Sequence, residues 1–253
     1  DAEEYYYYIQ PAIENATAGD TISLGSMEYN ENIVIDKSLT LTGSSSDSTI
    51  ITGEVSGLGS PPLFNSSLTA ISITTDDVEV SDLTVSNFNL GIRMSQADRT
   101  ILSNIIIIDM DREGIYAIQS EDVEFDNLYI ESSSYHGIYI GDASPYSTIT
   151  DSIIVDGNSH GMIIESSNAY VHNVSISGNS GYGLQFAFGS GSTISNSTIE
   201  NNGMNGIKLQ AVTSANVEDN TIFDNGLTEI YMVSSYNVVI YGNSISNEYD
   251  GVG

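Results

Sequence analysis

The sequence predicts an all-β fold, a solenoid of about nine to ten coils of short parallel strands (a parallel β-helix) with a short N-terminal capping helix. First, a glycine followed by an apolar residue recurs at intervals of 23, 23, 24, 22 and 23 residues. Second, two columns of turn-forming residues share this period. Third, about 23 residues can hold three short strands and three turns, but not a strand–helix unit with its connections. The glycine column comprises Gly91, Gly114, Gly137, Gly161, Gly183, Gly206 and, after Glu229, Gly251.

The turn columns predict where each coil bends, because Asn, Asp and Gly tolerate the left-handed backbone of a tight bend. In the first column, a polar residue precedes an inward apolar residue by three positions. Its polar members are Asp82, Ser103, Asn127, Asp151, Asn173, Asn196, Asp219 and Gly242, and its apolar members are Val85, Ile106, Ile130, Ile154, Ile176, Ile199, Ile222 and Ile245. The second column comprises Asn87, Asn158, Asn179, Asn202, Asn225 and Asn247.

The chain divides into an N-terminal segment and the solenoid. Residues 1–20 hold a Tyr-rich run and an amphipathic helix from Ile9 to Ala16, which we expect to cap the first coil. The β-helix is predicted over residues 21–253, with a loop inserted at 53–68 and a last partial coil that is uncapped. Its early strands are expected at Thr21–Leu24, Asn32–Ile35, Leu39–Thr42 and Thr49–Thr52.

The amino-acid composition limits the classes of partner that the protein can bind. Five basic and 34 acidic residues give a formal charge of −29, so the surface is expected to repel nucleic acid, anionic lipid and polyuronate chains. Cysteine is absent, which excludes disulfides and thiolate chemistry, and no apolar run is long enough to predict a membrane-spanning helix. Low Lys content with abundant Ser, Thr, Asn, Gly and Tyr predicts an extracellular or cell-surface protein.

Between Ile9 and Gly43 the chain contains the segments IQPAI, GDTI, NIVI and KSLTLTG. This order resembles the N-terminal coil of right-handed parallel β-helix proteins of the pectin-lyase-like superfamily, including NosD-type periplasmic and archaeal cell-surface proteins. The later coils match the generic repeat of these proteins, so the resemblance covers nearly the whole chain. It implies a right-handed coil but no single function, because the superfamily includes lyases, hydrolases, epimerases, adhesins and structural proteins.

The resemblance also suggests where an active site would lie. Polysaccharide lyases of this superfamily use a basic residue to abstract a proton and hold calcium with carboxylates. In this chain Arg93 or Arg112 would be the base, while Asp109, Asp111 and Glu113 would hold calcium; otherwise no cofactor is expected. The alternative is a solvated turn with local charge pairing. Paired-Asp signatures typical of hydrolases on this fold are absent.

Two stacked columns beside the glycines are candidate binding residues. The residues just before the glycines place Glu113, His136 and His160 one coil apart, close enough for a metal or an acid–base pair. The outward residues two positions after the glycines place Arg93, Tyr116 and Tyr139 in neighbouring coils, where the tyrosines could stack on sugar rings. The alternatives are hydrogen-bonding histidines and an aromatic ladder that stabilises the sheet.

The two ends of the chain predict association. Tyr5, Tyr6, Tyr7 and Tyr8 form a strand-favouring segment, and the last partial coil, with Tyr249 and Val252, lacks a cap. We therefore expect head-to-tail contacts between copies, which build filaments or sheets unless the rotation closes. The alternative is a repeat domain whose Tyr run packs on its own first coil. Glycosylation sequons begin at Asn15, Asn65, Asn173 and Asn196.

Together these patterns favour a non-enzymatic, extracellular structural or adhesive module of a cell envelope that assembles end to end. The alternative is a carbohydrate-binding or polysaccharide-degrading protein, a lyase or hydrolase, with its groove along Arg93, Asp111, Glu113, Tyr116, His136, Tyr139 and His160. A third interpretation, metal handling of the NosD sort, depends on the resemblance and the two histidines.

Overall fold

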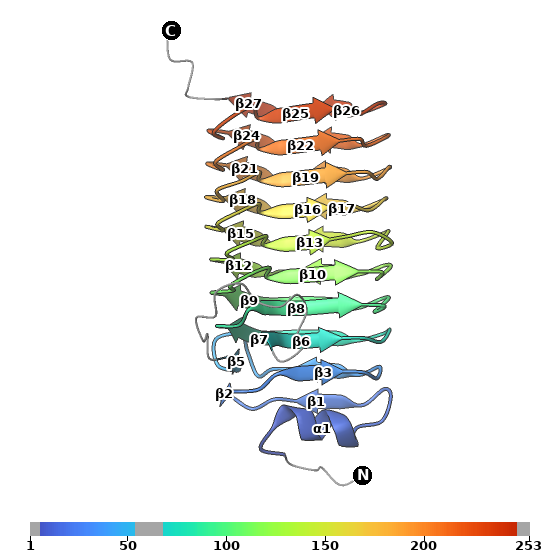
Figure 1. Cartoon of the computed structure of the whole chain (residues 1–253), viewed down its shortest axis with the longest axis vertical. Helices are drawn as coiled ribbons and strands as arrows, with labels where there is room; N and C mark the ends of the chain where they lie inside the picture. The colour runs from blue at the N-terminus through green and yellow to red at the C-terminus, as the bar shows by residue number, and fades with distance from the viewer. Residues whose placement is uncertain (1–5, 54–67, 247–253) are drawn as a thin grey trace.

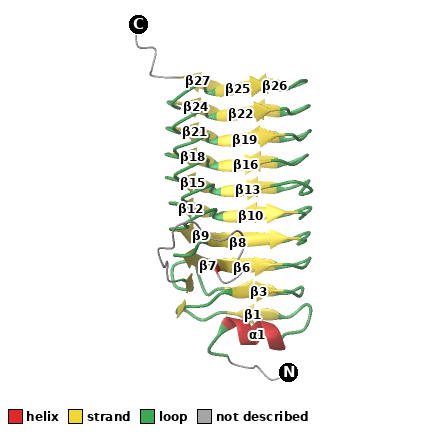
Figure 2. Ribbon diagram, in the orientation of Figure 1, coloured by secondary structure: helices red, strands yellow, loops and turns green. Residues whose placement is uncertain are grey.

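The computed structural model describes residues 6–53 and 68–246, and within them the chain winds into a parallel β-solenoid. A single short helix, α1 (Ile9–Asn15), lies at the N-terminal end, and strands β1 to β27 follow it in stacked layers (Figures 1 and 2). All the strand pairs among these residues are parallel, and one of the sheets that they form has nine strands. The predicted fold class is therefore confirmed.

The strands form three parallel stacks, here called faces 1, 2 and 3. Face 1 holds β1 (Thr21–Ser23), β4 (Thr40–Thr42), β7 (Glu79–Ser86), β9 (Ile101–Ile108), β11 (Glu124–Asp126), β14 (Thr148–Thr150), β17 (Tyr170–His172), β20 (Thr193–Ser195), β23 (Asn216–Glu218) and β26 (Val239–Tyr241). Face 2 holds β2 (Glu28–Tyr29), β5 (Ile50–Thr52), β12 (Tyr129–Glu131), β15 (Ile153–Val155), β18 (Ser175–Ser177), β21 (Thr198–Glu200), β24 (Thr221–Phe223) and β27 (Ser244–Ser246). The long strands β7 and β9 join the two faces.

Face 3 is a separate sheet. It holds β3 (Ile33–Ile35), β6 (Thr69–Ile73), β8 (Leu90–Ser95), β10 (Ile115–Ile118), β13 (Ile138–Ile140), β16 (Met162–Ile164), β19 (Leu184–Ala187), β22 (Ile207–Gln210) and β25 (Ile230–Val233). Along each strand the side chains alternate between the core and the surface. The predicted inward positions are fully buried at Ile92, Ile115, Ile138, Met162, Leu184 and Ile207.

The corner between faces 1 and 2 confirms most of the first turn column. Left-handed backbone occurs at Asp82, Asn127, Asp151, Asn173, Asn196, Asp219 and Gly242. In the coil of β9 the prediction was wrong by one residue. Asn104, with φ 54°, makes the bend instead of Ser103, and Ile107 points inward instead of Ile106. The run from Ile105 to Ile108 offers an apolar residue at every position, so alternation could not identify the inward one.

The corner between faces 2 and 3 corrects the second turn column after Asn87. The left-handed residues are Asp109, Ser132, Asp156, Gly178, Asn201 and Asp224, and not the predicted asparagines Asn158, Asn179, Asn202 and Asn225. Asn179, Asn202 and Asn225 follow the bend and are buried. Each side-chain amide donates a hydrogen bond to the one in the next coil. Nδ2 of Asn179 donates to Oδ1 of Asn202 at 3.0 Å, and Nδ2 of Asn202 donates to Oδ1 of Asn225 at 3.0 Å. This buried ladder satisfies polar groups inside the corner.

The glycine column is required by space and not by an unusual backbone angle. A Cβ atom built on Gly137 would lie 2.7 Å from the carbonyl oxygen of Gly161 in the next coil, and one on Gly206 would lie 2.8 Å from that of Glu229. Neither glycine has a left-handed φ. The coils therefore approach too closely at this corner for a side chain.

Helix α1 covers the first coil, as the sequence predicts, but it ends at Asn15 instead of Ala16. Its first backbone N–H groups donate to the carboxylate of Glu31, from Ile9 at 2.8 Å and from Gln10 at 3.1 Å. The Gln10 side chain also accepts a hydrogen bond from the Val34 N–H at 2.8 Å, so this backbone group at the edge of β3 has a partner. At the other end, Lys37 donates to the helix carbonyls of Glu14 and Ala16.

We predict that Gly137→Ala lowers the free energy of unfolding by about 1–3 kcal/mol, because the added methyl group overpacks the corner. Urea unfolding followed by circular dichroism measures this change. The matched control is Gly25→Ala, whose Cβ would meet only the Tyr29 hydroxyl at 3.7 Å. Equal stability of the two variants would contradict the steric explanation of the glycine column.

Candidate functional site

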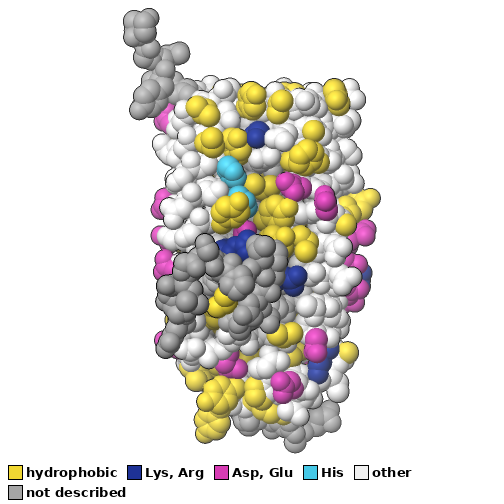
Figure 3. Space-filling model, viewed as in Figure 1, with side chains coloured by type: hydrophobic (Ala, Val, Ile, Leu, Met, Phe, Trp, Pro, Cys, Tyr) yellow, Lys and Arg dark blue, Asp and Glu magenta, His cyan; other side chains and the backbone are white. Residues whose placement is uncertain are grey.

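Face 3 gathers most of the scarce basic and histidine side chains. The chain has five Lys and Arg residues and three histidines. Arg93, Arg112 and Lys208 lie on or beside face 3, together with His136 and His160. On this side of the solenoid, Figure 3 shows blue and cyan side chains next to hydrophobic ones in yellow. We define the face 3 cluster as Arg93, Arg112, Glu113, Tyr116, His136, Tyr139, His160, Glu165, Tyr182 and Lys208.

The outward column of face 3 brings Arg93, Tyr116 and Tyr139 together as predicted. Parallel pairing aligns Arg93 on β8 with Tyr116 on β10, and Tyr116 with Tyr139 on β13. The two tyrosine rings are stacked, with centroids 5.0 Å apart and planes 11° apart. The column continues through Ile163, Gln185 and Lys208.

The second column stacks His136 on His160, also as predicted. Backbone bonds from Gly114 to His136 and from Gly137 to His160 set this register. The two imidazole centroids are 5.2 Å apart, and His160 stacks in turn on Tyr182 at 4.5 Å. Glu113, at the same position one coil below His136, pairs instead with Arg112, whose Nε lies 3.4 Å from Oε2.

Burial holds both imidazoles in the neutral form. It lowers the pKa of His136 to about 3, with smaller contributions from His160 and Arg112, and the Nδ1 atom of His136 is buried without a hydrogen-bond partner. Burial and the charge of Lys208 lower the pKa of His160. Its Nδ1 accepts the backbone N–H of Tyr182 at 2.8 Å, so the remaining proton is on Nε2.

Tyr139 is held as a protonated hydroxyl. Its Oη donates to Oε2 of Glu165 at 2.7 Å. Burial raises the pKa of Tyr139, and the hydrogen bond to Glu165 raises it further. Burial also raises the pKa of Glu113, against the opposing effect of Arg112. The centre of the cluster therefore combines a neutral imidazole with a protonated phenol.

Lys208 forms the other end of the cluster. Its Nζ donates to the Tyr182 hydroxyl at 3.1 Å and lies 4.5 Å from the centroid of that ring. Among residues 6–53 and 68–246, Lys208 makes no ion pair. The side chain is half-buried on β22 and makes its contacts with Tyr182.

The predicted calcium ligands are not gathered into one group. Asp109 and Asp111 are exposed at the corner before face 3, whereas Glu113 is 2% exposed. No group of three His, Cys, Asp or Glu side chains in the described part of the chain could hold a metal ion. Calcium binding stays a prediction, and so does metal binding by Glu113, His136 and His160.

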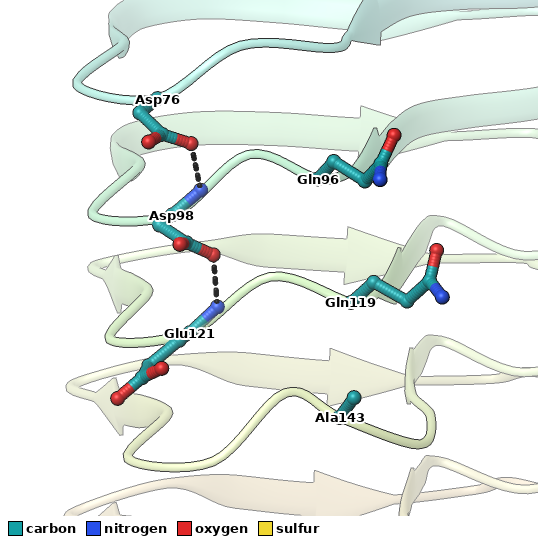
Figure 4. A pocket seen from close by; sticks show the side chains of 6 residues that line it. All are labelled: Asp76, Gln96, Asp98, Gln119, Glu121 and Ala143. Atoms are coloured by element: carbon teal, nitrogen blue, oxygen red, sulfur yellow. Dashed lines mark hydrogen bonds between the residues drawn. The ribbon is translucent and has the colours of Figure 1, made fainter.

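A separate surface cavity of about 340 Å³ lies at the corner between faces 3 and 1 (Figure 4). Its acidic side chains maintain the turn, because Asp76 accepts the N–H of Asp98 at 3.0 Å and Asp98 accepts that of Glu121 at 2.8 Å. Arg99 belongs to this corner, where it pairs with Asp76 and Asp77. Arg99 is therefore no part of the face 3 cluster.

The other predicted site residues are at the surface or outside the described residues. Asn15 lies at the end of α1, and Asn173 and Asn196 occupy exposed left-handed bends. Tyr6, Tyr7 and Tyr8 are exposed at the N-terminal end. Residues 54–67 of the predicted insertion, with Asn65, lie outside the described residues, and so do Tyr5, Asn247, Tyr249, Gly251 and Val252.

Three members of the cluster were missed as site residues. Tyr182 and Lys208 lie in the predicted columns, so the repeat period was the signal that could have found them. Glu165 has no such signal, because its contact depends on how far the Tyr139 side chain reaches between coils.

The right-handed β-helix family matches residues 26–173 and 146–253, so the chain belongs to this family. No curated protein sequence matches the chain. Among solved structures, the Azotobacter vinelandii mannuronan C-5 epimerase AlgE4 A-module superposes with a TM-score of 0.71 at 17% identity, covering 90% of this chain and 80% of that one.

Two further solved structures are similar. The periplasmic alginate epimerase AlgG has a TM-score of 0.73 at 16% identity over 87% of this chain, which spans 59% of that protein's chain. XylC in complex with xylose has a TM-score of 0.74 at 10% identity, covering 95% of this chain and 66% of that one. At such identities these similarities establish the fold alone. No helix in the described residues is long and apolar enough to cross a membrane.

The low pKa of His136 predicts a pH-dependent stability. An unfolded histidine takes up a proton near pH 6.5, whereas folded His136 does so only near pH 3. As pH falls through this window, His136 should lower the free energy of unfolding by up to about 1.4 kcal/mol per pH unit. Urea unfolding at pH 7 and pH 5 should therefore show a smaller loss for His136→Gln than for the unmodified protein. Equal losses would contradict the burial of the neutral ring.

Proposed function

We propose that the protein acts on a polysaccharide that carries carboxylate groups and lies along face 3. The observation that supports this most strongly is the gathering of Arg93, Arg112 and Lys208 with His136 and Tyr139, in a chain of formal charge −29. These side chains give face 3 a local positive charge, which favours a ligand that carries carboxylates. Similar folds in proteins named as alginate epimerases and in a xylose complex support a carbohydrate ligand.

The contacts of face 3 suit a sugar chain. Tyr116 and Tyr139 stack on each other, and their outward ring edges offer apolar surface that a sugar can contact. Arg93, next to Tyr116 in the outward column, can bind a carboxylate through two parallel hydrogen bonds. This local positive charge offsets the repulsion that the acidic composition led us to expect for acidic glycans.

The proposed reaction begins with removal of the proton on the carbon next to a uronate carboxylate. Arg93 neutralises that carboxylate, and the neutral imidazole of His136 accepts the proton. A bound anion also raises the low pKa of His136, because it favours the imidazolium. Tyr139 then donates its proton, either to the departing glycosidic oxygen or to the opposite side of the same carbon. The first outcome is elimination and the second is epimerisation.

Incubation with polymannuronate and with polygalacturonate in D₂O tests this proposal. Deuterium incorporation at the carbon next to the carboxylate, measured by NMR, reports epimerisation, and ultraviolet absorbance of an unsaturated sugar reports elimination. We expect His136→Gln and Tyr139→Phe each to slow the exchange by about 10²–10⁴-fold.

A second stacked Tyr–His pair provides matched controls for these variants. Tyr170 and His172 lie on face 1, with ring centroids 5.5 Å apart. Tyr170→Phe and His172→Gln should leave the exchange rate unchanged. Binding of these polymers without any exchange would limit the protein to carbohydrate recognition, and the absence of both would reject the proposed function.

The structural or adhesive role stays a second candidate because of the last described coil. Met232, Ile240 and Ile245 are 40%, 41% and 49% exposed, whereas Leu209, Val217 and Ile222 at the same positions one coil earlier are fully buried. Exposed apolar groups on an unpaired strand edge favour association. We propose end-to-end contact between copies, outside the cell or at its surface, with the N-terminal tyrosines as the complementary part.

Light scattering and electron microscopy test the assembly. The unmodified protein should form concentration-dependent oligomers, and a triple Met232→Ser, Ile240→Ser, Ile245→Ser variant should remain monomeric because it loses the apolar contact. Deletion of residues 1–8 should have the same effect. Unchanged assembly after this deletion would refute the participation of the tyrosines.

A further inference from the structure

Two cations of the face 3 cluster, Arg93 and Lys208, lie five strands apart in one outward column, which continues beyond them to Ser72 and to Tyr231. The column contains Arg93, Tyr116, Tyr139, Ile163, Gln185 and Lys208. Five strand steps separate Arg93 from Lys208, and at about 4.8 Å per step they are about 24 Å apart along the solenoid. Arg112 lies beside the Arg93 end, where it pairs with Glu113.

The middle of this column is neutral to negative. Tyr116, Tyr139, Ile163 and Gln185 carry no charge at neutral pH. Glu165 follows β16 and places its carboxylate against the Tyr139 hydroxyl, between the two cations. A ligand along face 3 therefore meets positive charge twice and a carboxylate in between.

We propose that the polysaccharide bound by face 3 carries carboxylates sparsely, about one in every five sugars. This inference rests on the proposed function and names its substrate class. We take one sugar per rung for a chain that lies along the face, with rungs about 4.8 Å apart. Two carboxylates at the Arg93 and Lys208 ends are therefore separated by four neutral sugars.

A polymer with a carboxylate on every sugar fits this face poorly. It would place negative charges on the middle rungs opposite Glu165, where no cation of the column can pair with them. The formal charge of −29 adds long-range repulsion that grows with every carboxylate of the ligand. A sparsely charged chain keeps both end contacts and avoids most of this repulsion.

The middle rungs also offer contacts that neutral sugars use. Tyr116 and Tyr139 stack on each other with their planes 11° apart, so a ligand along the column meets mainly their ring edges. Beyond them, Gln185 is only 8% exposed and its Nε2 lies 3.5 Å from Oε1 of Gln210, so the half-buried Gln210 is the more accessible amide for a sugar hydroxyl. None of these contacts requires a charge on the sugar.

The test is calorimetric binding of the full chain at low ionic strength to polygalacturonate and polymannuronate whose carboxylates have been reduced to alcohols by graded amounts. These series vary charge density while sugar and linkage stay constant. We expect the affinity to peak near one carboxylate in five sugars, at least tenfold above that for the fully charged polymer.

Two variants locate the effect. Lys208→Met should weaken binding of the sparsely charged polymer about tenfold, whereas Arg99→Gln, which removes the same charge at a distant corner, should not. Glu165→Gln should improve binding of the fully charged polymer and leave that of the sparse polymer nearly unchanged. Circular dichroism confirms that each variant is folded.

The outcomes separate the two claims. An affinity that rises steadily up to full charge, or an unchanged affinity in Lys208→Met, overturns the sparse-charge inference and leaves the proposed function standing. Failure of every carboxylate-bearing polymer in both series to bind overturns the proposed function and this inference with it.

Discussion

The parallel hydrogen-bond ladder between successive coils is the constraint on which the rest of the structure depends. Once Ile115 pairs with Ile92 and Ile138 with Ile115, every side chain of one coil lies above its counterpart in the previous one. The ladder thereby builds the inward apolar column and the outward columns with a single register. A shift of one residue in this register would expose the core side chains and separate the residues of the candidate site. Stability and function therefore depend on the same strand pairing.

Some corners between the strands stabilise the solenoid by hydrogen-bonding their buried polar groups, whereas others leave buried polar groups without a partner. In the later coils the buried amides of Asn179, Asn202 and Asn225 bond one another and the backbone. This ladder ends where the N–H of Gly157 donates to Asn179, and Ser133 takes the position one coil earlier. Among the described residues, buried side-chain atoms without a hydrogen-bond partner include Oγ of Ser133 and Nδ1 of His136 in these earlier coils, and also Oγ of Ser166 one coil later. The candidate site thus occupies the region where the structural ladder is interrupted.

Net charge and local charge lead to different expectations, and the arrangement on face 3 reconciles them. A formal charge of −29 disfavours densely charged anions, while the two cations Arg93 and Lys208 of one column favour an anionic ligand. Burial adds to the local effect, because it keeps His136 and His160 neutral and so prevents further positive charge from accumulating. The result is a surface suited to few, widely spaced negative groups among neutral sugars.

The sequence by itself determined the coil, its period, the inward column and the stacking of Tyr116 on Tyr139 and His136 on His160, because a solenoid converts a fixed spacing along the chain into contact in space. It did not determine which of four successive isoleucines in β9 points inward, since an unbroken apolar run carries no alternation. Nor could it show that Glu113 pairs with Arg112 or that Tyr139 reaches Glu165. Those contacts depend on side-chain direction and burial at the corner, and only the tertiary structure decides them.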